Sequence, residues 1–191
     1  MRGPRGGLIL SRDRCWHKKL QSSVFPGVQG SLHTQVIAAK AVCLGEALSD
    51  QFRQYGKAVR DNARILARTL IEKNIDVVSG GTDTHMVLLD LSSKKIHGQQ
   101  AQDALANINI TSNKNPIPFD SLNPSEWAGL RLGVSAATTR GLQASDFEVL
   151  GNVIADAINH DETDSASLIT KHRETVARIC KACPIYQGTS A

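Results

Sequence analysis

Residues 75–90 read IDVVSGGTDTHMVLLD, and this stretch decides the fold. Two apolar runs, Ile75–Val78 and Met86–Asp90, flank the turn-forming residues Ser79–Asp83. Short apolar runs bounded by glycine and small polar residues are typical of strands that pair with each other. The stretch therefore predicts a sheet in a chain whose other patterns are mostly helical.

Working outward, we expect a long amphipathic helix from about Ser49 to Lys73, because apolar residues recur there at spacings of three or four. Upstream we expect a helix over Arg12–Gln21, a loop over Val24–Gly30 and, from its apolar composition, a buried helix over Leu32–Leu48. Downstream we expect a helix over His97–Ala106, strands over Ile108–Ser112 and Leu130–Val134, and helices over Ala144–Asn159 and Ser165–Ala182. This order describes an α/β or α+β domain from about residue 54 onward, with a piece of another domain before it.

The composition is that of a globular protein. Of the 191 residues, 41% are hydrophobic, which is enough to bury a core. The net charge of +4 is scattered along the chain, so a nucleic-acid partner is not favoured. No apolar run approaches the roughly 18 residues of a membrane span, and no signal-peptide pattern opens the sequence. We expect no membrane partner.

Four cysteines are too few for a secreted disulfide scaffold, so we expect reduced thiols and a cytoplasmic location. Cys180 and Cys183 form a single CxxC without a second pair, so no metal site is expected there. We interpret them as small apolar residues that close a helix before Pro184.

Polar and glycine residues gather in loops beside the predicted strands, where sites commonly lie. Glycine-rich segments often serve only backbone geometry, and Asp83 with His85 can simply stabilise a turn. Arg131 is different, because it lies between Leu130 and Leu132 in a short strand. It must point to solvent or pair with a carboxylate, and if it faces a site it would bind an anion.

Six segments of this chain, taken in order, resemble the C-terminal portion of the bacterial-type serine (glycine) hydroxymethyltransferases. They are RGPRGGLI at 2–9, VFPGVQG at 24–30, VIAAKAV at 36–42, SGGTDTH at 79–85, TSNKN at 111–115 and GLRLGVSAATTRG at 129–141. The similarity extends over essentially the whole chain. It implies the C-terminal part of an aspartate-aminotransferase-like, pyridoxal-phosphate-dependent transferase fold, with residues 1–53 ending the large cofactor-binding domain and residues 54–191 forming the small domain.

The resemblance also implies a homodimer that transfers the one-carbon unit of serine to tetrahydrofolate and leaves glycine. Arg131 matches the arginine that binds the substrate carboxylate, for which a planar bidentate donor is suited. Other matched positions are assigned to pyridoxal phosphate (Gly27, Gly30 and Arg5) and to folate (Asn115, Asn123 and Ser125). In such enzymes the cofactor carries the chemistry while the protein orients it.

Some positions depart from the family pattern. The Schiff-base lysine of the family falls two residues before Met1, so no catalytic residue is assigned, and we expect the isolated chain to be inactive. Ser31 replaces a glycine of the phosphate loop and can obstruct close backbone approach. The resemblance also places residues 1–50 in a domain whose remaining core is not in this sequence, so apolar surface on the 32–48 helix is expected to be exposed. The alternative is a non-catalytic module that pairs with a full-length hydroxymethyltransferase or complements a separate N-terminal fragment.

Overall fold

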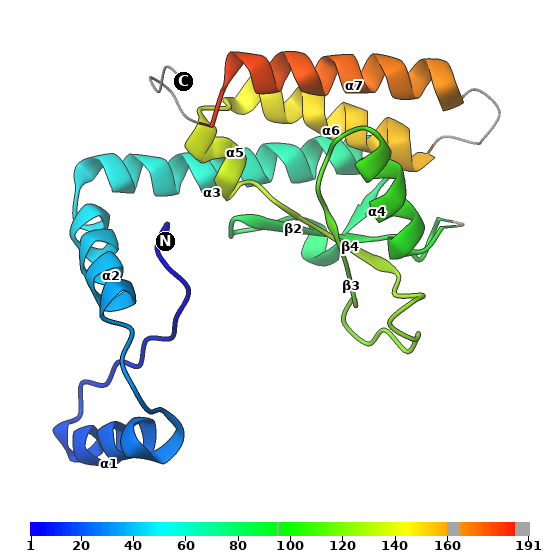
Figure 1. Ribbon diagram of the computed structural model, residues 1–191. Coiled ribbons are helices and arrows are strands. Elements are labelled where there is room, and N and C mark those ends of the chain that lie inside the picture. The colour runs from blue at the N-terminus through cyan, green and yellow to red at the C-terminus, as the bar shows by residue number, and fades with distance from the viewer. Residues whose placement is uncertain (95, 160–164, 186–191) are drawn as a thin grey trace. The chain divides into compact units, whose positions relative to one another are not determined.

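The computed structural model describes residues 1–94, 96–159 and 165–185 and divides the chain into two compact units, Met1–Gln54 and Tyr55–Ala191 (Figure 1). None of the helices in the described ranges is long and apolar enough to cross a membrane.

The first unit is mostly helical and has almost no core. Its elements are η1 (Arg14–Trp16), α1 (His17–Ser22), η2 (Ser23–Val28), α2 (Thr34–Ala47) and the start of α3 (Asp50–Glu72). Cys43 is the only buried residue among residues 1–54. The prediction of a buried helix from apolar composition is therefore wrong for α2, where Ile37 is 50% exposed and Val42 63% exposed. The helix forms, but the elements of this unit are too few to cover both of its faces, as the resemblance led us to expect.

The second unit contains a four-stranded sheet in which all neighbours are antiparallel. The strands are β1 (Asp76–Val77), β2 (Met86–Asp90), β3 (Asn113–Asn115) and β4 (Gly129–Gly133), and their order is β1-β2-β4-β3. The expected pairing of the two runs around the Ser79–Asp83 turn is confirmed. Figure 1 shows the sheet with helices gathered along one side of it.

Those helices are α3, α4 (Gly98–Asn107), α6 (Ala144–Asn159) and α7 (Ser165–Ala182), with the short α5 (Ser135–Arg140) between β4 and α6. On α3 the buried residues Val59, Ala63, Leu66 and Leu70 recur every three or four positions, so one face of the helix enters the core. They pack in one cluster with side chains from every second position of β2 and β4. Among the described residues of this α/β unit, no helix covers the opposite face of the sheet.

The strand expected over Ile108–Ser112 is wrong. The backbone N–H groups of Ile108 and Ile110 both donate to the carbonyl of Leu105, at 3.1 and 2.9 Å, so this segment closes the C-terminus of α4. Asn109 adopts a positive φ of 62°, as helix-terminating residues often do. The strand begins only at Asn113.

Candidate functional site

The open face of the sheet is built around Arg131. Along β4, Leu130 and Leu132 are buried while Arg131 is exposed, because successive residues of a strand point to opposite faces. The register places Leu88 of β2 and Asn113 of β3 on either side of Arg131, in one row across the sheet. Sequence reasoning missed both neighbours, although alternation along a correctly placed β3 would have identified Asn113.

Arg131 forms no ion pair with any carboxylate in the described ranges. Of the two orientations left open by the sequence, it therefore takes the one towards solvent. An exposed guanidinium fixed at a central strand of a sheet presents a planar pair of donors, which is the geometry that binds a carboxylate.

The strand next to it carries Asn115, one of the residues assigned to folate by the resemblance. Its register partner is Gly129, two positions from Arg131, so the structure brings these two predicted residues to the same part of the sheet. The Asn115 amide donates to the carbonyl of Pro116 at 2.8 Å. Gln102 of α4 accepts from the backbone N–H of Lys114 at 2.8 Å and so attaches β3 to the helical layer.

Asp120 organises the loop between β3 and β4, a role that no motif in the sequence indicated. Its carboxylate accepts backbone N–H groups from Leu122 at 3.0 Å, Ala128 at 3.0 Å and Ile117 at 3.4 Å. These bonds, that of Leu122 foremost, lower the pKa of the Asp120 carboxyl from its usual value, although desolvation opposes them. A single carboxylate thus joins the end of the loop near Asn115 to the residue just before β4.

The other two predicted folate residues lie in the same loop. Asn123 and Ser125 are both exposed, and the carbonyl of Asn123 accepts from the N–H of Glu126 at 2.8 Å in a turn. Neither side chain makes a hydrogen bond with the described part of the chain. They are available to a ligand, but no described contact directs them towards Arg131.

The glycine-rich turn before β2 is fixed without His85. Asp83 pairs with Arg64 of α3, and the hydroxyl of Thr82 donates to the carbonyl of Met86 at 2.7 Å. The prediction that the side chains of Asp83 and His85 stabilise the turn together is therefore wrong. The backbone carbonyl of His85 nevertheless accepts from the N–H of Val134 at 3.1 Å. That bond extends the pairing of β2 with the end of β4.

The residues assigned to the cofactor phosphate all lie in the first unit. Arg5, Gly27 and Gly30 are exposed, and Arg5 forms no ion pair with the described residues. A guanidinium and loop N–H groups are the donors that a phosphate needs. An added Cβ at Gly30 would meet nothing within 4 Å, so no close packing inside the chain requires that glycine. Because Cys43 is the only buried residue of this unit, the residues of the unit fit the phosphate of pyridoxal phosphate but do not enclose its pyridine ring.

Comparison with known proteins shows what this chain is similar to. A family model described as serine hydroxymethyltransferase matches residues 1–154. A 2-methylserine hydroxymethyltransferase from Paracoccus sp is 58% identical over 187 residues, which are 97% of this chain and 44% of that protein. One from Aminobacter sp is also 58% identical, with the same coverage. A serine hydroxymethyltransferase from Paramagnetospirillum magneticum is 46% identical over 190 residues, 98% of this chain and 44% of its own length. The chain thus spans less than half the length of these relatives.

Proposed function

Because this chain belongs to the serine hydroxymethyltransferase family and corresponds to the C-terminal portion of its full-length enzymes, we propose that it forms the end of the large domain and the small domain of a hydroxymethyltransferase and binds the substrate α-carboxylate through Arg131. The observation that carries this proposal is the position of Arg131, which is exposed on the open face of the sheet without a carboxylate partner in the described ranges. Substrate carboxylates are commonly bound by an arginine held on a rigid element.

The substrate class that we propose is a 2-amino-3-hydroxy acid, either serine or its 2-methyl derivative. Loss of the hydroxymethyl group converts serine to glycine and 2-methylserine to alanine, with tetrahydrofolate as acceptor. The relatives named for 2-methylserine are 56–58% identical to this chain, whereas those named for serine are 44–47% identical. This difference supports the methylated substrate.

Pyridoxal phosphate is the cofactor that we propose, and it would supply the electron sink for breaking the bond to the hydroxymethyl carbon. Arg5 and the N–H groups around Gly27 and Gly30 would hold its phosphate, in a homodimer of the whole enzyme. We assign folate to Asn115, Asn123 and Ser125, because all three lie on β3 or the loop that leads from it to β4.

The test is a chimera in which this chain replaces the matching 187 residues of the Paracoccus enzyme. We expect the chimera to convert 2-methylserine to alanine faster than serine to glycine in the presence of tetrahydrofolate. The Arg131→Met substitution should raise KM for either amino acid by about 30-fold or more, because truncating one partner of a charge pair costs at least about 2 kcal/mol.

The matched control is Arg178→Met, because Arg178 is exposed on α7 and forms no ion pair in the described ranges. It should leave KM unchanged. An active chimera whose KM is the same with and without Arg131 would overturn the proposed role of that residue. An active chimera that accepts serine but not 2-methylserine would overturn the substrate assignment alone.

A second candidate is a non-catalytic module that pairs with a hydroxymethyltransferase or with a separate N-terminal portion of one. Exposed apolar side chains in the first unit support it: Leu10 is 83% exposed, Val28 81% and Leu48 80%. Exposed apolar surface of this extent is commonly covered by a partner. Gel filtration of the chain mixed with the N-terminal portion of the Paracoccus enzyme tests this candidate, which requires a stable complex; elution of the two chains as separate species would contradict it.

A further inference from the structure

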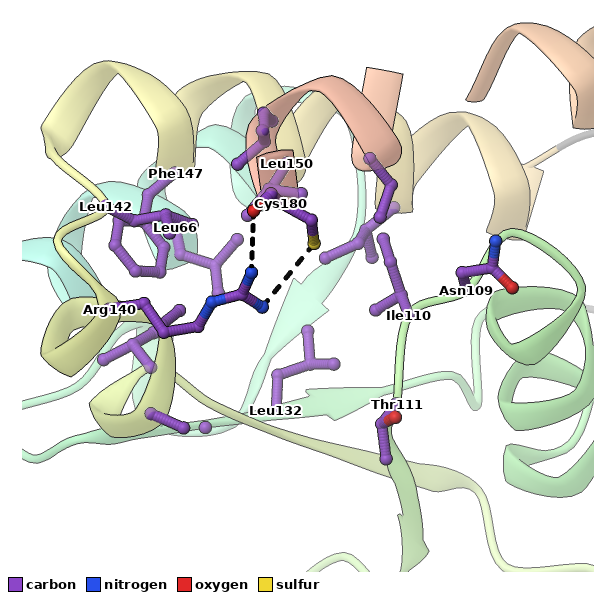
Figure 2. Close-up of a pocket in the computed structure, with 17 residues that line it drawn as sticks. Leu66, Asn109, Ile110, Thr111, Leu132, Arg140, Leu142, Phe147, Leu150 and Cys180 are labelled. Carbon is purple, nitrogen blue, oxygen red and sulfur yellow. Dashed lines mark hydrogen bonds between the residues drawn. The ribbon is translucent and has the colours of Figure 1, made fainter. Parts of the chain in front are cut away.

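The second unit contains a cavity of about 320 Å³ on the helix-covered side of the sheet, away from Arg131. Its lining is mostly apolar and comes from α3, from β4, from the segment after α4 and from α5, α6 and α7. Figure 2 shows Leu132, Ile110, Leu142 and Phe147 around this space. Because Leu132 and Arg131 point to opposite faces of the same strand, the cavity is separate from the carboxylate site.

A guanidinium projects into this apolar space. Arg140, the last residue of α5, lines the cavity and is half-buried (Figure 2). Its Nε donates to the carbonyl of Cys183 at 2.8 Å, and its Nη2 donates to the carbonyl of Cys180 at 3.0 Å. Both carbonyls lie at the C-terminus of α7, where unpaired carbonyls carry partial negative charge.

Hydrogen bonds to the C-terminus of α7 account for Nε and Nη2 of the guanidinium but not for its third nitrogen, Nη1. Among the described residues, Nη1 has only the Cys180 sulfur, a weak acceptor, at 3.6 Å. Arg140 forms no ion pair with a carboxylate in the part of the chain that the structure describes. A half-buried cation among apolar side chains usually has an anionic partner, because its desolvation is otherwise uncompensated.

The size of the cavity limits what could supply that partner. Its volume is about twice the roughly 150 Å³ of an apolar cavity that holds benzene. It therefore accommodates one aromatic ring, or a short alkyl chain, together with one small charged group. Ligand sites of this kind combine an apolar lining with a few polar groups that fix orientation.

We propose that this cavity binds a small monocarboxylic acid with an apolar body. The carboxylate accepts from Nη1 of Arg140, and the apolar body packs against Leu132, Phe147 and Ile154. Such a ligand completes the hydrogen bonds of the guanidinium while leaving those to α7 intact. The inference does not depend on the proposed function, because none of these residues belongs to the Arg131 site.

The Cys180 thiol lines the cavity and serves as a reporter of occupancy. The experiment measures the rate at which N-ethylmaleimide modifies Cys180 in the full chain, by mass spectrometry of peptides, with 3-phenylpropionate as the probe ligand. Cys15 is exposed and belongs to the first unit, so it is an internal control. The uncharged analogue 3-phenylpropan-1-ol has the same apolar body and tests the contribution of charge without any substitution.

We expect 3-phenylpropionate to slow modification of Cys180 by about tenfold at a concentration ten times its Kd. The alcohol should bind at least about tenfold more weakly, because it lacks the charge-assisted bond to Arg140. Modification of Cys15 should not change. No protection of Cys180 by the acid, equal protection by acid and alcohol, or equal slowing at Cys15 would each overturn the proposal.

A pair of alanine substitutions tests the location of the ligand. Ala136 and Ala177 are both exposed residues on helices, but only Ala136 lines the cavity. Ala136→Leu should fill the entrance and abolish protection by the acid, whereas Ala177→Leu should preserve it. Protection that survives Ala136→Leu would place the ligand elsewhere and contradict the assignment.

Discussion

The approach of β3 to β4 depends on the absence of a side chain at Gly129. A Cβ built there would collide with the backbone oxygen of Asn115 and lie 2.9 Å from Cγ2 of Ile117. A backbone oxygen cannot rotate away, so Gly129→Ala must separate the two strands. Overpacking of this kind costs about 1–3 kcal/mol, and the smaller entropy of the unfolded alanine chain returns only about 0.4–1 kcal/mol. We therefore expect the second unit to lose about 1–2 kcal/mol of unfolding free energy.

The assay is urea unfolding followed by the fluorescence of Trp127, in a Trp16→Phe background so that only the second unit reports. Gly133→Ala is the matched control, because Gly133 lies in the same strand and an added Cβ there meets nothing within 4 Å. It should be neutral or slightly stabilising. The strand packing described here would be refuted if Gly129→Ala unfolded at the same urea concentration as the parent, or if Gly133→Ala lost as much stability.

Two further predictions concern the loop before β4 and the core. Backbone hydrogen bonds, first that of Leu122, lower the pKa of the Asp120 carboxyl below its unfolded value near 3.8. The stabilisation of the loop by the Asp120 carboxylate should therefore be complete at pH 6, and it should be lost as the pH falls through the lower folded pKa. The protection factors of the Leu122 and Ala128 amides, which are corrected for the intrinsic pH dependence of exchange, should therefore fall in acid. Asp120→Asn should show the reduced protection already at pH 6; unchanged protection in the variant would contradict this role. In the core, Leu70→Ala should lower the free energy of unfolding by about 2–5 kcal/mol in the same urea assay, since Leu70 is fully buried. The control Ile71→Ala, at a residue that is 42% exposed, should lower it by about 1 kcal/mol or less. Equal losses for the two variants would show that the inward face of α3 is misassigned.

Regular elements with a clear period could be predicted from the sequence. The helices over Ala144–Asn159 and Ser165–Ala182 and the strand over Met86–Asp90 are confirmed at the predicted bounds. The two helices have enough residues for apolar positions to recur at a period of 3.6, and the strand is a short apolar run that follows a turn. The exposure of Arg131 follows from the same alternation once its strand is placed.

Features that leave no periodic pattern in the sequence could not be predicted. The Ile108–Ser112 segment has strand-forming residues, but the backbone N–H groups of Ile108 and Ile110 bond to the carbonyl of Leu105 and close the C-terminus of α4. The helix α5 is only six residues long, too short to show a period. The role of Asp120 depends on a hydrogen bond from the N–H of Ala128, eight residues away, and the cavity beside Arg140 depends on six separate segments.

Binding of the substrate carboxylate by Arg131 is tested most directly by comparing serine with serinamide, in which an uncharged carboxamide replaces that carboxylate. In the chimera with the Paracoccus enzyme, we expect serine to bind about 30-fold more tightly than serinamide, corresponding to about 2 kcal/mol for the charge pair. The Arg131→Met substitution should reduce this ratio of dissociation constants to about one, while Arg178→Met should preserve it. A ratio that stays the same after Arg131→Met would contradict the account.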